Sequence, residues 1–349
     1  MQIAEIVQQD IDGLVQIHRS IESEKGSADE KFQDCLSSID PSADPPKKRR
    51  RTMTWDKLQK HLSQGFGMGH GAEYRPWLIL RRKNPSKTSN QLAAHLSPLR
   101  RDACFFSRGE YQIALLLLWL GVEDLREQYP LWPIAHPHPL YGVLGSDGPN
   151  SKYCTGLLDI AQLAGIDHGV YPGTNIPYVA TIDFLLTVKI EGELRLVAIS
   201  CKPFEDPSSD IKWRVLERLE LERRYAEANG ILYYVYNSRL VPILMAGQLE
   251  WCIDLAFLDD AQHLVTFVER FATEFESTPD LAIADAVVRA CQICNISLDD
   301  GWTVFRHCAW SQKVDIDLSQ PILTSYPANR GGRALRAELR RSLISGWVS

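Results

Sequence analysis

Apolar residues recur along this chain in two patterns, one typical of helices and one typical of buried strands. Helical spacing of the apolar positions predicts helices over 55–63, 108–121 and 211–228. Dense apolar runs rich in β-branched and aromatic residues predict strands over 178–190, 194–203 and 231–236. From residue 108 onward the order helix, strand, strand, helix, strand indicates a compact α/β domain rather than a regular βα repeat.

The two ends of the chain depart from this pattern. Apolar positions over 3–15 predict a short amphipathic helix, and a proline-containing acidic stretch after it is typical of a linker. Beyond residue 240 only helical spacing continues. It predicts helices over 247–258, 261–276 and 280–294, then an irregular or short-strand stretch, and a final arginine-rich helix over 330–341. We therefore expect an N-terminal extension over 1–51, an α/β domain over 52–240 and a helical domain over 241–349.

The strands over 178–190 and 194–203 form a predicted hairpin whose register fixes which polar residues meet. A two-residue loop at Glu191-Gly192 pairs position 183 with position 200, and a loop one residue later pairs it with position 202. Opposed residues share a face of the sheet, so either register sets Asp183 beside Ser200 and Lys202. A three-residue loop would break the arrangement unless a bulge restored it. A structural Asp–Lys ion pair and a functional site are both compatible with these positions.

A second carboxylate, Glu110, is predicted near the start of the 108–121 helix. Its neighbours on the same helix face are Ile113, Ala114 and Leu117, so its side chain is expected to point toward the core. By itself it could simply be an acid that the helix N-terminus stabilises. Two carboxylates and one ammonium group are what metal-assisted phosphodiester hydrolysis requires, because carboxylates bind Mg²⁺ and the metal activates water. The lysine would then orient that water or offset charge on the phosphoryl oxygens.

Asp183 followed by Ser200-Cys201-Lys202 resembles the PD-(D/E)xK nuclease motif. The wider sequence, over roughly residues 52–240, resembles the TnsA endonuclease subunits of heteromeric cut-and-paste transposases. The similar segments, in the order of that family, are 65–78, the helix at Glu110, 125–131, 164–168, 181–185, 201–203 and 219–225. The C-terminal part is similar only in size and helical character.

This resemblance implies a restriction-endonuclease-like α/β fold, with a mixed sheet flanked by helices and a mainly helical C-terminal domain after it. It implies a Mg²⁺-dependent endonuclease that hydrolyses phosphodiester bonds at the 5′ ends of a transposon. By position in the motif, Glu110 and Asp183 would be metal ligands, Cys201 would offer its backbone carbonyl, and Lys202 would be the catalytic lysine. The family resemblance implies two Mg²⁺ ions, for which Mn²⁺ can substitute.

The chain departs from the family pattern at Ser200, where a glutamine or another longer polar residue is usual. Because a serine reaches less far, we expect Ser200 to hold the second metal ion weakly or through water. Glu222 matches an acid of the family whose role the resemblance does not assign. The N-terminal extension and the arginine-rich end also exceed the family pattern.

The implied partners are transposon-end DNA, a DDE-type transposase subunit that cuts and joins the 3′ ends, and an AAA+ ATPase regulator that contacts the C-terminal domain. The whole chain carries a net charge of −6, but residues 1–44 hold ten acids and three bases, which leaves +1 on the rest. Local basic clusters are therefore the candidates for phosphate contacts. They are Arg81-Arg82-Lys83, Arg100-Arg101, the basic run over 47–51 and the C-terminal arginines. The alternative for the run over 47–51 is a set of charged side chains that only contact solvent.

The chain has neither a signal-peptide pattern at its start nor an apolar run of about 18 residues, so we expect a soluble cytoplasmic bacterial protein without membrane contacts. Its eight cysteines are then expected to stay reduced. Zinc binding by Cys291, Cys294, His307 and Cys308 is disfavoured, because the first two cysteines lie on an apolar helix. A Cys201 nucleophile lacks an orienting partner.

Two alternatives to a transposase subunit remain at this point. One is a restriction or repair nuclease that cuts DNA alone. The other is a nuclease-fold scaffold without catalytic activity, which Ser200 favours. The glycine-rich loop over 65–71 is not a P-loop, because no Gly-Lys-Ser/Thr follows it, and we expect a tight loop or turn there.

Overall fold

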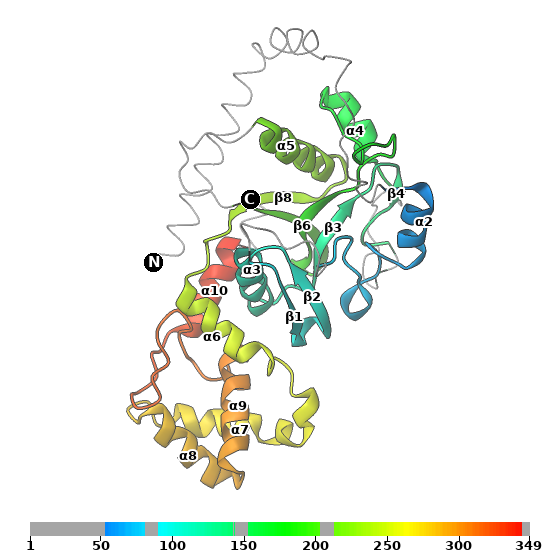
Figure 1. The fold of residues 1–349 in the computed structure, drawn as a ribbon. Helices are drawn as coiled ribbons and strands as arrows, with labels where there is room; N and C mark the ends of the chain where they lie inside the picture. Colours follow the sequence, from blue (N-terminus) through cyan, green and yellow to red (C-terminus); the bar gives the residue numbers. More distant parts are fainter. Residues whose placement is uncertain (1–52, 81–89, 142, 144–152, 203–212, 344–349) are drawn as a thin grey trace.

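A computed structural model of the chain describes residues 53–80, 90–141, 143, 153–202 and 213–343 (Figure 1). The predicted N-terminal helix, the basic run over 47–51 and the candidate DNA contacts Arg81, Arg82 and Lys83 lie outside the described residues.

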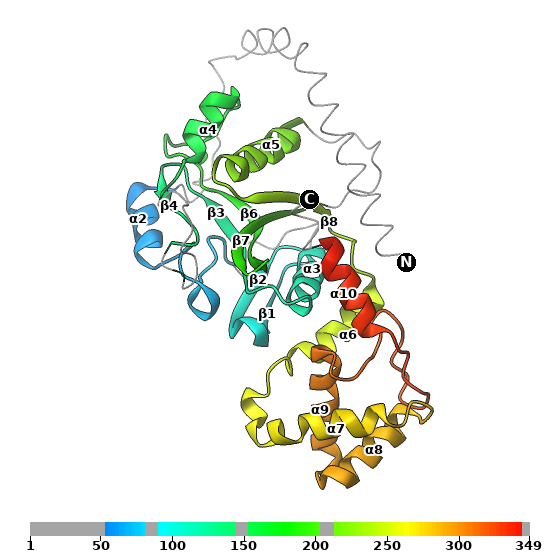
Figure 2. The ribbon, with the colours of Figure 1, turned by 180° about the vertical axis from the view of Figure 1, so that it is seen from behind.

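A four-stranded mixed sheet forms the centre of the α/β part, with strand order β3-β6-β7-β8 (Figure 2). The β3–β6 and β6–β7 pairs are antiparallel, whereas β7 and β8 are parallel. These strands are β3 (Asp124–Leu131), β6 (Ala180–Ile190), β7 (Glu193–Lys202) and β8 (Leu232–Asn237). Two small antiparallel pairs accompany the sheet, β1 (Leu92–Leu96) with β2 (Arg101–Phe105) and β4 (His136–Pro137) with β5 (Tyr153–Cys154).

The β6–β7 hairpin has the first of the two predicted registers. Its ladder runs from Ile190 paired with Glu193 to Phe184 paired with Ile199, around the two-residue loop Glu191-Gly192. Both loop residues have positive φ, 51° and 90°, which is the backbone of a tight hairpin turn that matches the twist of its strands.

Helices cover both faces of the sheet (Figures 1 and 2). On one face, Phe184 and Ile199 pack in a buried cluster with α3. On the other face, Leu185 and Ala198 pack in a separate cluster with α4 and α5. This alternation is what strands buried on both faces require. The helices of this part are α2 (Trp55–Ser63), α3 (Arg108–Trp119), α4 (Leu157–Ala164) and α5 (Trp213–Ala228), with 3-10 turns η1 (Gly71–Glu73) and η2 (Ser97–Leu99). The mixed sheet with flanking helices confirms the predicted α/β fold class.

The C-terminal part is helical, as predicted, but it contains one helix that was not predicted. The sequence pattern indicates irregular structure after residue 294, whereas α9 occupies this stretch. A built Cβ on Gly301 would lie 2.0 Å from Cys291 Sγ, so the glycine that weakens the helical pattern lets α9 pack closely on α8. The elements are α6 (Ile243–Ile253), η3 (Asp259–Phe267), α7 (Val268–Glu276), α8 (Ile283–Cys294), α9 (Leu298–Ser311) and α10 (Gly332–Leu343).

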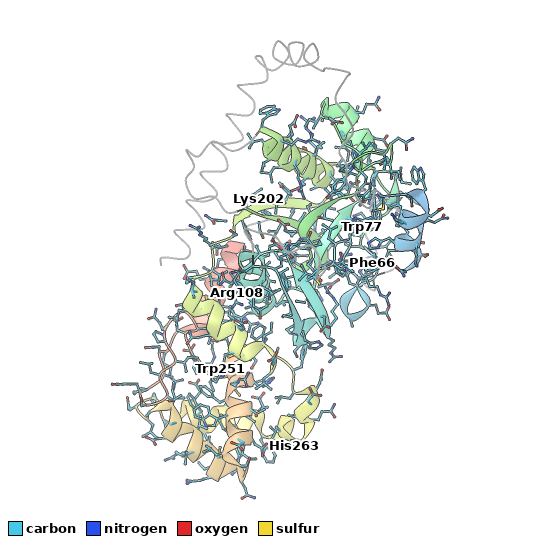
Figure 3. All side chains as sticks on the ribbon, in the orientation of Figure 1. Phe66, Trp77, Arg108, Lys202, Trp251 and His263 are labelled. Carbon is cyan, nitrogen blue, oxygen red and sulfur yellow. The ribbon has the colours of Figure 1, made fainter. Side chains whose placement is uncertain are left out.

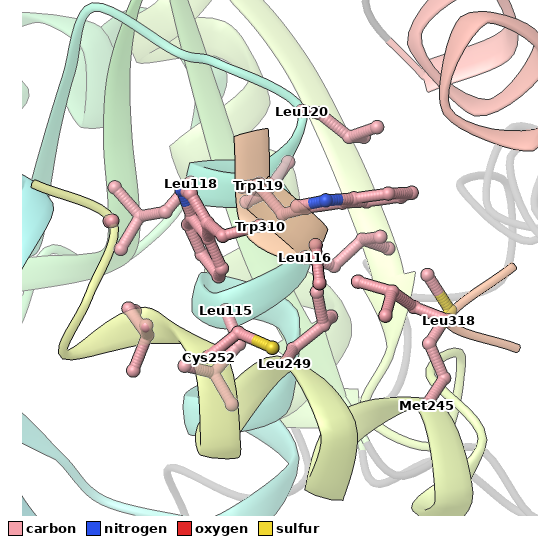
Figure 4. Close-up of a cluster of buried hydrophobic side chains, with 14 of the residues drawn as sticks. Leu115, Leu116, Leu118, Trp119, Leu120, Met245, Leu249, Cys252, Trp310 and Leu318 are labelled. Atoms are coloured by element: carbon pink, nitrogen blue, oxygen red, sulfur yellow. The ribbon is translucent and has the colours of Figure 1, made fainter. Parts of the chain in front are cut away.

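Helix α3 is shared between the sheet and the C-terminal helices. Its residues from Leu115 to Trp119, together with Leu120 just after it, pack with Leu249 and Cys252 of α6 and with Trp310 of α9 in one buried cluster (Figure 4). From α10, Arg340 donates to the carbonyls of Leu120 and Gly121 just after α3. The domain boundary at residue 240 stays a prediction. Within the described residues, no helix combines the length and apolar character needed to cross a bilayer.

Candidate active site

Asp183 lies on β6 at a position that is paired with neither of the two neighbouring strands, β3 and β7. The β6–β7 ladder ends at Phe184 and Ile199, and the β3–β6 ladder omits Asp183 and the opposite residue, Gln128. Asp183 Oδ2 accepts hydrogen bonds from the backbone N–H of Cys201 at 2.7 Å and from Lys202 Nζ at 3.2 Å. The carboxylate thus replaces a main-chain partner at the end of the hairpin.

The break on the β3 side comes from the backbone of Gln128. Its φ of 48° is in the left-handed region, which a residue with a side chain adopts at a cost of about 1–3 kcal/mol. The Gln128 carbonyl accepts from the Trp77 N–H at 3.3 Å instead of pairing in the ladder. Its side-chain Oε1 accepts from the Thr181 hydroxyl at 3.1 Å. The pairing of β3 with β6 is therefore interrupted directly opposite Asp183.

Lys202 completes the end of β7 (Figure 3). Its Nζ is 3.2 Å from Asp183 Oδ2 and 3.2 Å from the Cys201 carbonyl oxygen. Burial by itself lowers the pKa of Lys202, but the charges of Asp183 and Glu222 outweigh it and raise the pKa, so the amine is an ammonium at neutral pH. Burial also raises the pKa of the Cys201 thiol well above its usual value, which removes the thiolate that a cysteine nucleophile needs.

Glu110 occupies the third position of α3 and exchanges two hydrogen bonds with Ser107, the N-cap residue of this helix. The Ser107 hydroxyl accepts from the Glu110 N–H at 3.1 Å and donates to Glu110 Oε1 at 3.0 Å, while Oε2 accepts from the Phe106 N–H at 2.9 Å. The residue is only 8% exposed. Burial, and then the nearby charge of Asp183, raise the pKa of Glu110 to about 7. Glu110 is therefore both a helix cap and an electrostatic neighbour of Asp183.

A glycine allows the start of α3 to lie against the strand ends. A built Cβ on Gly109 would lie 2.3 Å from the Ser238 carbonyl oxygen, just after β8. The Ser238 N–H in turn donates to the Lys202 carbonyl at 2.9 Å. This close approach brings the first turn of α3, which carries Glu110, to the same end of the sheet as Lys202.

The donor set at this end of the sheet fits a divalent cation. The carboxylate of Asp183, whose charge raises the pKa of the Glu110 carboxyl, and the Glu110 carboxylate itself lie beside a main-chain carbonyl, and all three offer oxygen ligands of the kind that Mg²⁺ prefers. In the part of the chain that the structure describes, no group of three or more His, Cys, Asp or Glu side chains has a metal-binding arrangement. The set thus consists of two acids, and any further ligand would be main-chain, water or substrate oxygen.

The remaining predicted residues lie elsewhere or are already engaged. Ser200 is fully buried and its hydroxyl donates to Glu222 Oε2. Arg101 is 7% exposed and its guanidinium forms a 2.6 Å ion pair with Glu127, so the predicted phosphate contact does not fit this residue. Arg100 is exposed and forms an ion pair of 3.2 Å with Asp259.

The cysteine and histidine residues considered for zinc binding, and the glycine-rich loop over 65–71, contact other parts of the protein. Cys291 and Cys294 are buried free thiols on α8, and His307 Nδ1 lies 2.8 Å from the Leu255 carbonyl. In the glycine-rich loop, a built Cβ on Gly67 would lie 2.6 Å from the Pro130 side chain, so this loop packs closely against β3. The C-terminal arginines also make tertiary contacts, of which the ion pair between Arg330 and Glu276 is one.

Residues 151–238 match the family described as TnsA-like endonuclease N terminal, a stretch that contains Asp183, Ser200, Cys201 and Lys202. Over this stretch the chain is similar to the TnsA-like endonucleases. The matched stretch comprises β5, α4, β6, β7, α5 and β8, whereas Glu110 on α3 lies outside it. The transposon Tn7 transposition protein TnsA of Escherichia coli is 26% identical to this chain over 244 residues, which are 70% of this chain and 77% of that protein. The TnsA-like domain is that of an endonuclease family.

Proposed function

We propose that this chain is a Mg²⁺-dependent DNA endonuclease subunit of a transposase, which hydrolyses phosphodiester bonds at the 5′ ends of a transposon during cut-and-paste transposition. The observation that carries the proposal is the contact of Lys202 Nζ with both Asp183 Oδ2 and the Cys201 carbonyl at the end of the β6–β7 hairpin. The similarity to a transposition protein supports the biological setting.

Glu110, Asp183 and the Cys201 carbonyl would hold the metal, and two ions are the number that the family resemblance implies. A bound divalent ion supplies Lewis acidity to a phosphoryl oxygen and lowers the pKa of water. The buried Glu110 carboxylate must lose its proton to serve as a ligand, because its pKa is about 7 without a cation. Ser200 is not among the proposed ligands, since its hydroxyl already donates to Glu222.

Lys202 would act on the phosphate and on the attacking water as a charged hydrogen-bond donor. Its ammonium is held by Asp183 and by the Cys201 carbonyl, which fixes its direction. A positioned ammonium offsets the negative charge that develops on the phosphoryl oxygens. Because its raised pKa keeps it protonated, it does not act as the resting general base.

The proposed partners follow from the same resemblance. Transposon-end DNA would be the substrate, a DDE-type transposase subunit would cut and join the 3′ ends, and an AAA+ ATPase regulator would contact the helical part over 241–349. Among the described basic residues, Arg100 remains a candidate phosphate contact, because its side chain is 63% exposed.

A strand-specific cleavage assay tests the proposal. The full chain is incubated with its DDE-type partner and a plasmid carrying the transposon ends, with Mg²⁺, Mn²⁺ or a chelator. We expect metal-dependent cuts on the 5′ strand at each end, abolished by Asp183→Asn and Lys202→Ala. Lys189→Ala, an exposed lysine on the same hairpin, is the matched control and should cut normally.

Three outcomes would contradict the proposal. Full metal-dependent cleavage by both variants would refute the site. Efficient cutting of arbitrary DNA by the chain alone would favour a restriction or repair nuclease. The absence of both cleavage and carboxylate-dependent Mg²⁺ binding would favour an inactive scaffold.

A further inference from the structure

A buried carboxylate behind the candidate active site ties the two catalytic strands to α5. Glu222 is 1% exposed, and both of its oxygens accept hydrogen bonds. Oε2 accepts from the hydroxyls of Ser200 and Tyr233, the latter at 3.0 Å, and Oε1 accepts from Arg218 Nε at 3.1 Å. Arg218 Nη2 also donates to the Thr181 carbonyl at 3.0 Å. We call these five residues the Glu222 cluster.

Two connections of the Glu222 cluster to the sheet, those made through Ser200 and Thr181, each lie two residues from a group of the proposed site. Ser200 precedes Lys202 by two positions on β7, and Thr181 precedes Asp183 by two positions on β6. Side chains two residues apart on a strand lie on the same face, so the Ser200 hydroxyl meets Glu222 on the face to which Lys202 belongs, whereas the contact with Thr181 is made to its main-chain carbonyl. The negative charge of Glu222 also raises the pKa of Lys202.

Stability by itself does not account for a buried carboxylate here. Desolvating a carboxylate costs several kcal/mol, and apolar replacements of buried ion pairs are often neutral or stabilising. A site whose groups must be held within about 0.5 Å, in contrast, needs fixed neighbours behind it. The hydroxyls of Ser200 and Tyr233 both donate to Glu222. Burial and the charge of Glu222 raise the pKa of Tyr233 well above its usual value, so its phenol stays protonated and can donate.

We propose that Glu222 is a positioning residue, which holds β7 through Ser200 and β6 through Arg218 and Thr181 so that Lys202 and Asp183 meet at the proposed metal site. The inference rests on the proposed nuclease function. It also gives Ser200 a role other than metal ligand: the short side chain at this strand position contacts a carboxylate that comes from α5.

Ser200→Ala and Tyr233→Phe form a matched pair, because each removes one hydroxyl that donates to the same oxygen of Glu222. Only Ser200 lies on the strand that carries Lys202. We expect Ser200→Ala to lower the single-turnover cleavage rate at saturating Mg²⁺ about tenfold to a hundredfold, the effect of misplacing reacting groups. The Mg²⁺ concentration that gives half the maximal rate should not change. Tyr233→Phe should keep the wild-type rate although it loses an equivalent hydrogen bond.

Arg218→Lys tests the second connection and replaces Ser200→Ala if that variant does not fold. Its side chain is 48% exposed, and we expect the same loss of maximal rate because a lysine cannot bridge Glu222 and the Thr181 carbonyl. Wild-type rates in both Ser200→Ala and Arg218→Lys would overturn the inference. Equal losses of rate in Ser200→Ala and Tyr233→Phe would also overturn it, because they indicate a purely structural role. A third contrary result is a raised Mg²⁺ requirement at an unchanged maximal rate in Ser200→Ala, which indicates that Ser200 is a metal ligand. Asp183→Asn, run in parallel, separates these results from failure of the proposed function: if it still cuts, the nuclease site itself is wrong.

Discussion

The titration of Glu110 connects the geometry of the candidate site to a measurable property of the whole chain. Its carboxylate is buried at the start of α3, beside the charge of Asp183, and its pKa is raised to about 7 from an ordinary 4.5. Glu110→Gln removes this titration and keeps an oxygen that can accept from the Phe106 N–H, since the side-chain amide of glutamine also has an acceptor oxygen.

The sign of the effect follows from the direction of the shift. Below pH 4.5 Glu110 is protonated in both the folded and the unfolded chain, so the favourable contribution of the protonated folded form is fully present. As the pH rises toward 7, the unfolded chain loses this proton first, and the folded state becomes less stable relative to it. The shift from 4.5 to about 7 corresponds to a loss of about 3 kcal/mol in the free energy of unfolding.

Urea unfolding in the presence of a chelator, from pH 4.5 to 8, measures this loss. The difference between wild type and Glu110→Gln should change by about 3 kcal/mol over this range, with wild type losing stability as the pH rises. The same difference in an Asp183→Asn background should be smaller, because one of the causes of the raised pKa is removed. Parallel curves for wild type and Glu110→Gln, or a difference unchanged by Asp183→Asn, would refute the reasoning.

Three further substitutions test the supports of the site by urea unfolding. Gly109→Ala should cost about 1–3 kcal/mol, because its Cβ would meet the Ser238 carbonyl at 2.3 Å, and it should also reduce cleavage; a neutral result would exclude the close approach. Glu127→Ala should cost about 3–5 kcal/mol by leaving the buried Arg101 unpaired, more than the exposed-pair variant Asp259→Ala. Arg340→Ala should cost about 1–3 kcal/mol by freeing the carbonyls at the end of α3.

The hairpin at the centre of the site could be predicted from the sequence because local signals determine it. The turn at Glu191-Gly192 and the apolar strands on either side leave two registers, and both place Asp183 near Lys202; the structure has the first of them. The position of Glu110 was also predictable in part, because its apolar neighbours on the helix direct it inward. Both inferences use only the geometry of single elements and their nearest connections.

Features that depend on contacts between distant segments could not be predicted. Strand β3 carries Arg126, Glu127 and Gln128 in buried positions, although residues of these types are mostly exposed in folded proteins. Their burial is possible because partners such as Arg101 come from another strand.

Helix α9 was missed for a similar reason. Gly301 lowers the helical propensity of its stretch, and only the packing of α9 against Cys291 on α8 shows why a glycine is there. The first-turn signal, Ser297 followed by Asp299 and Asp300, was available in the sequence, and Ser297 does cap the helix. The contact between Ser200 and Glu222 joins β7 to α5, and no spacing rule reveals it.

Locating a bound divalent ion tests the central claim most directly. Crystals of the full chain soaked in Mn²⁺ should show an anomalous-scattering peak in contact with the carboxylates of Glu110 and Asp183 and the Cys201 carbonyl. The peak should be lost in Asp183→Asn and kept in Lys202→Ala. A metal-free site in the wild type at saturating Mn²⁺, or a peak that persists unchanged in Asp183→Asn, would contradict the account.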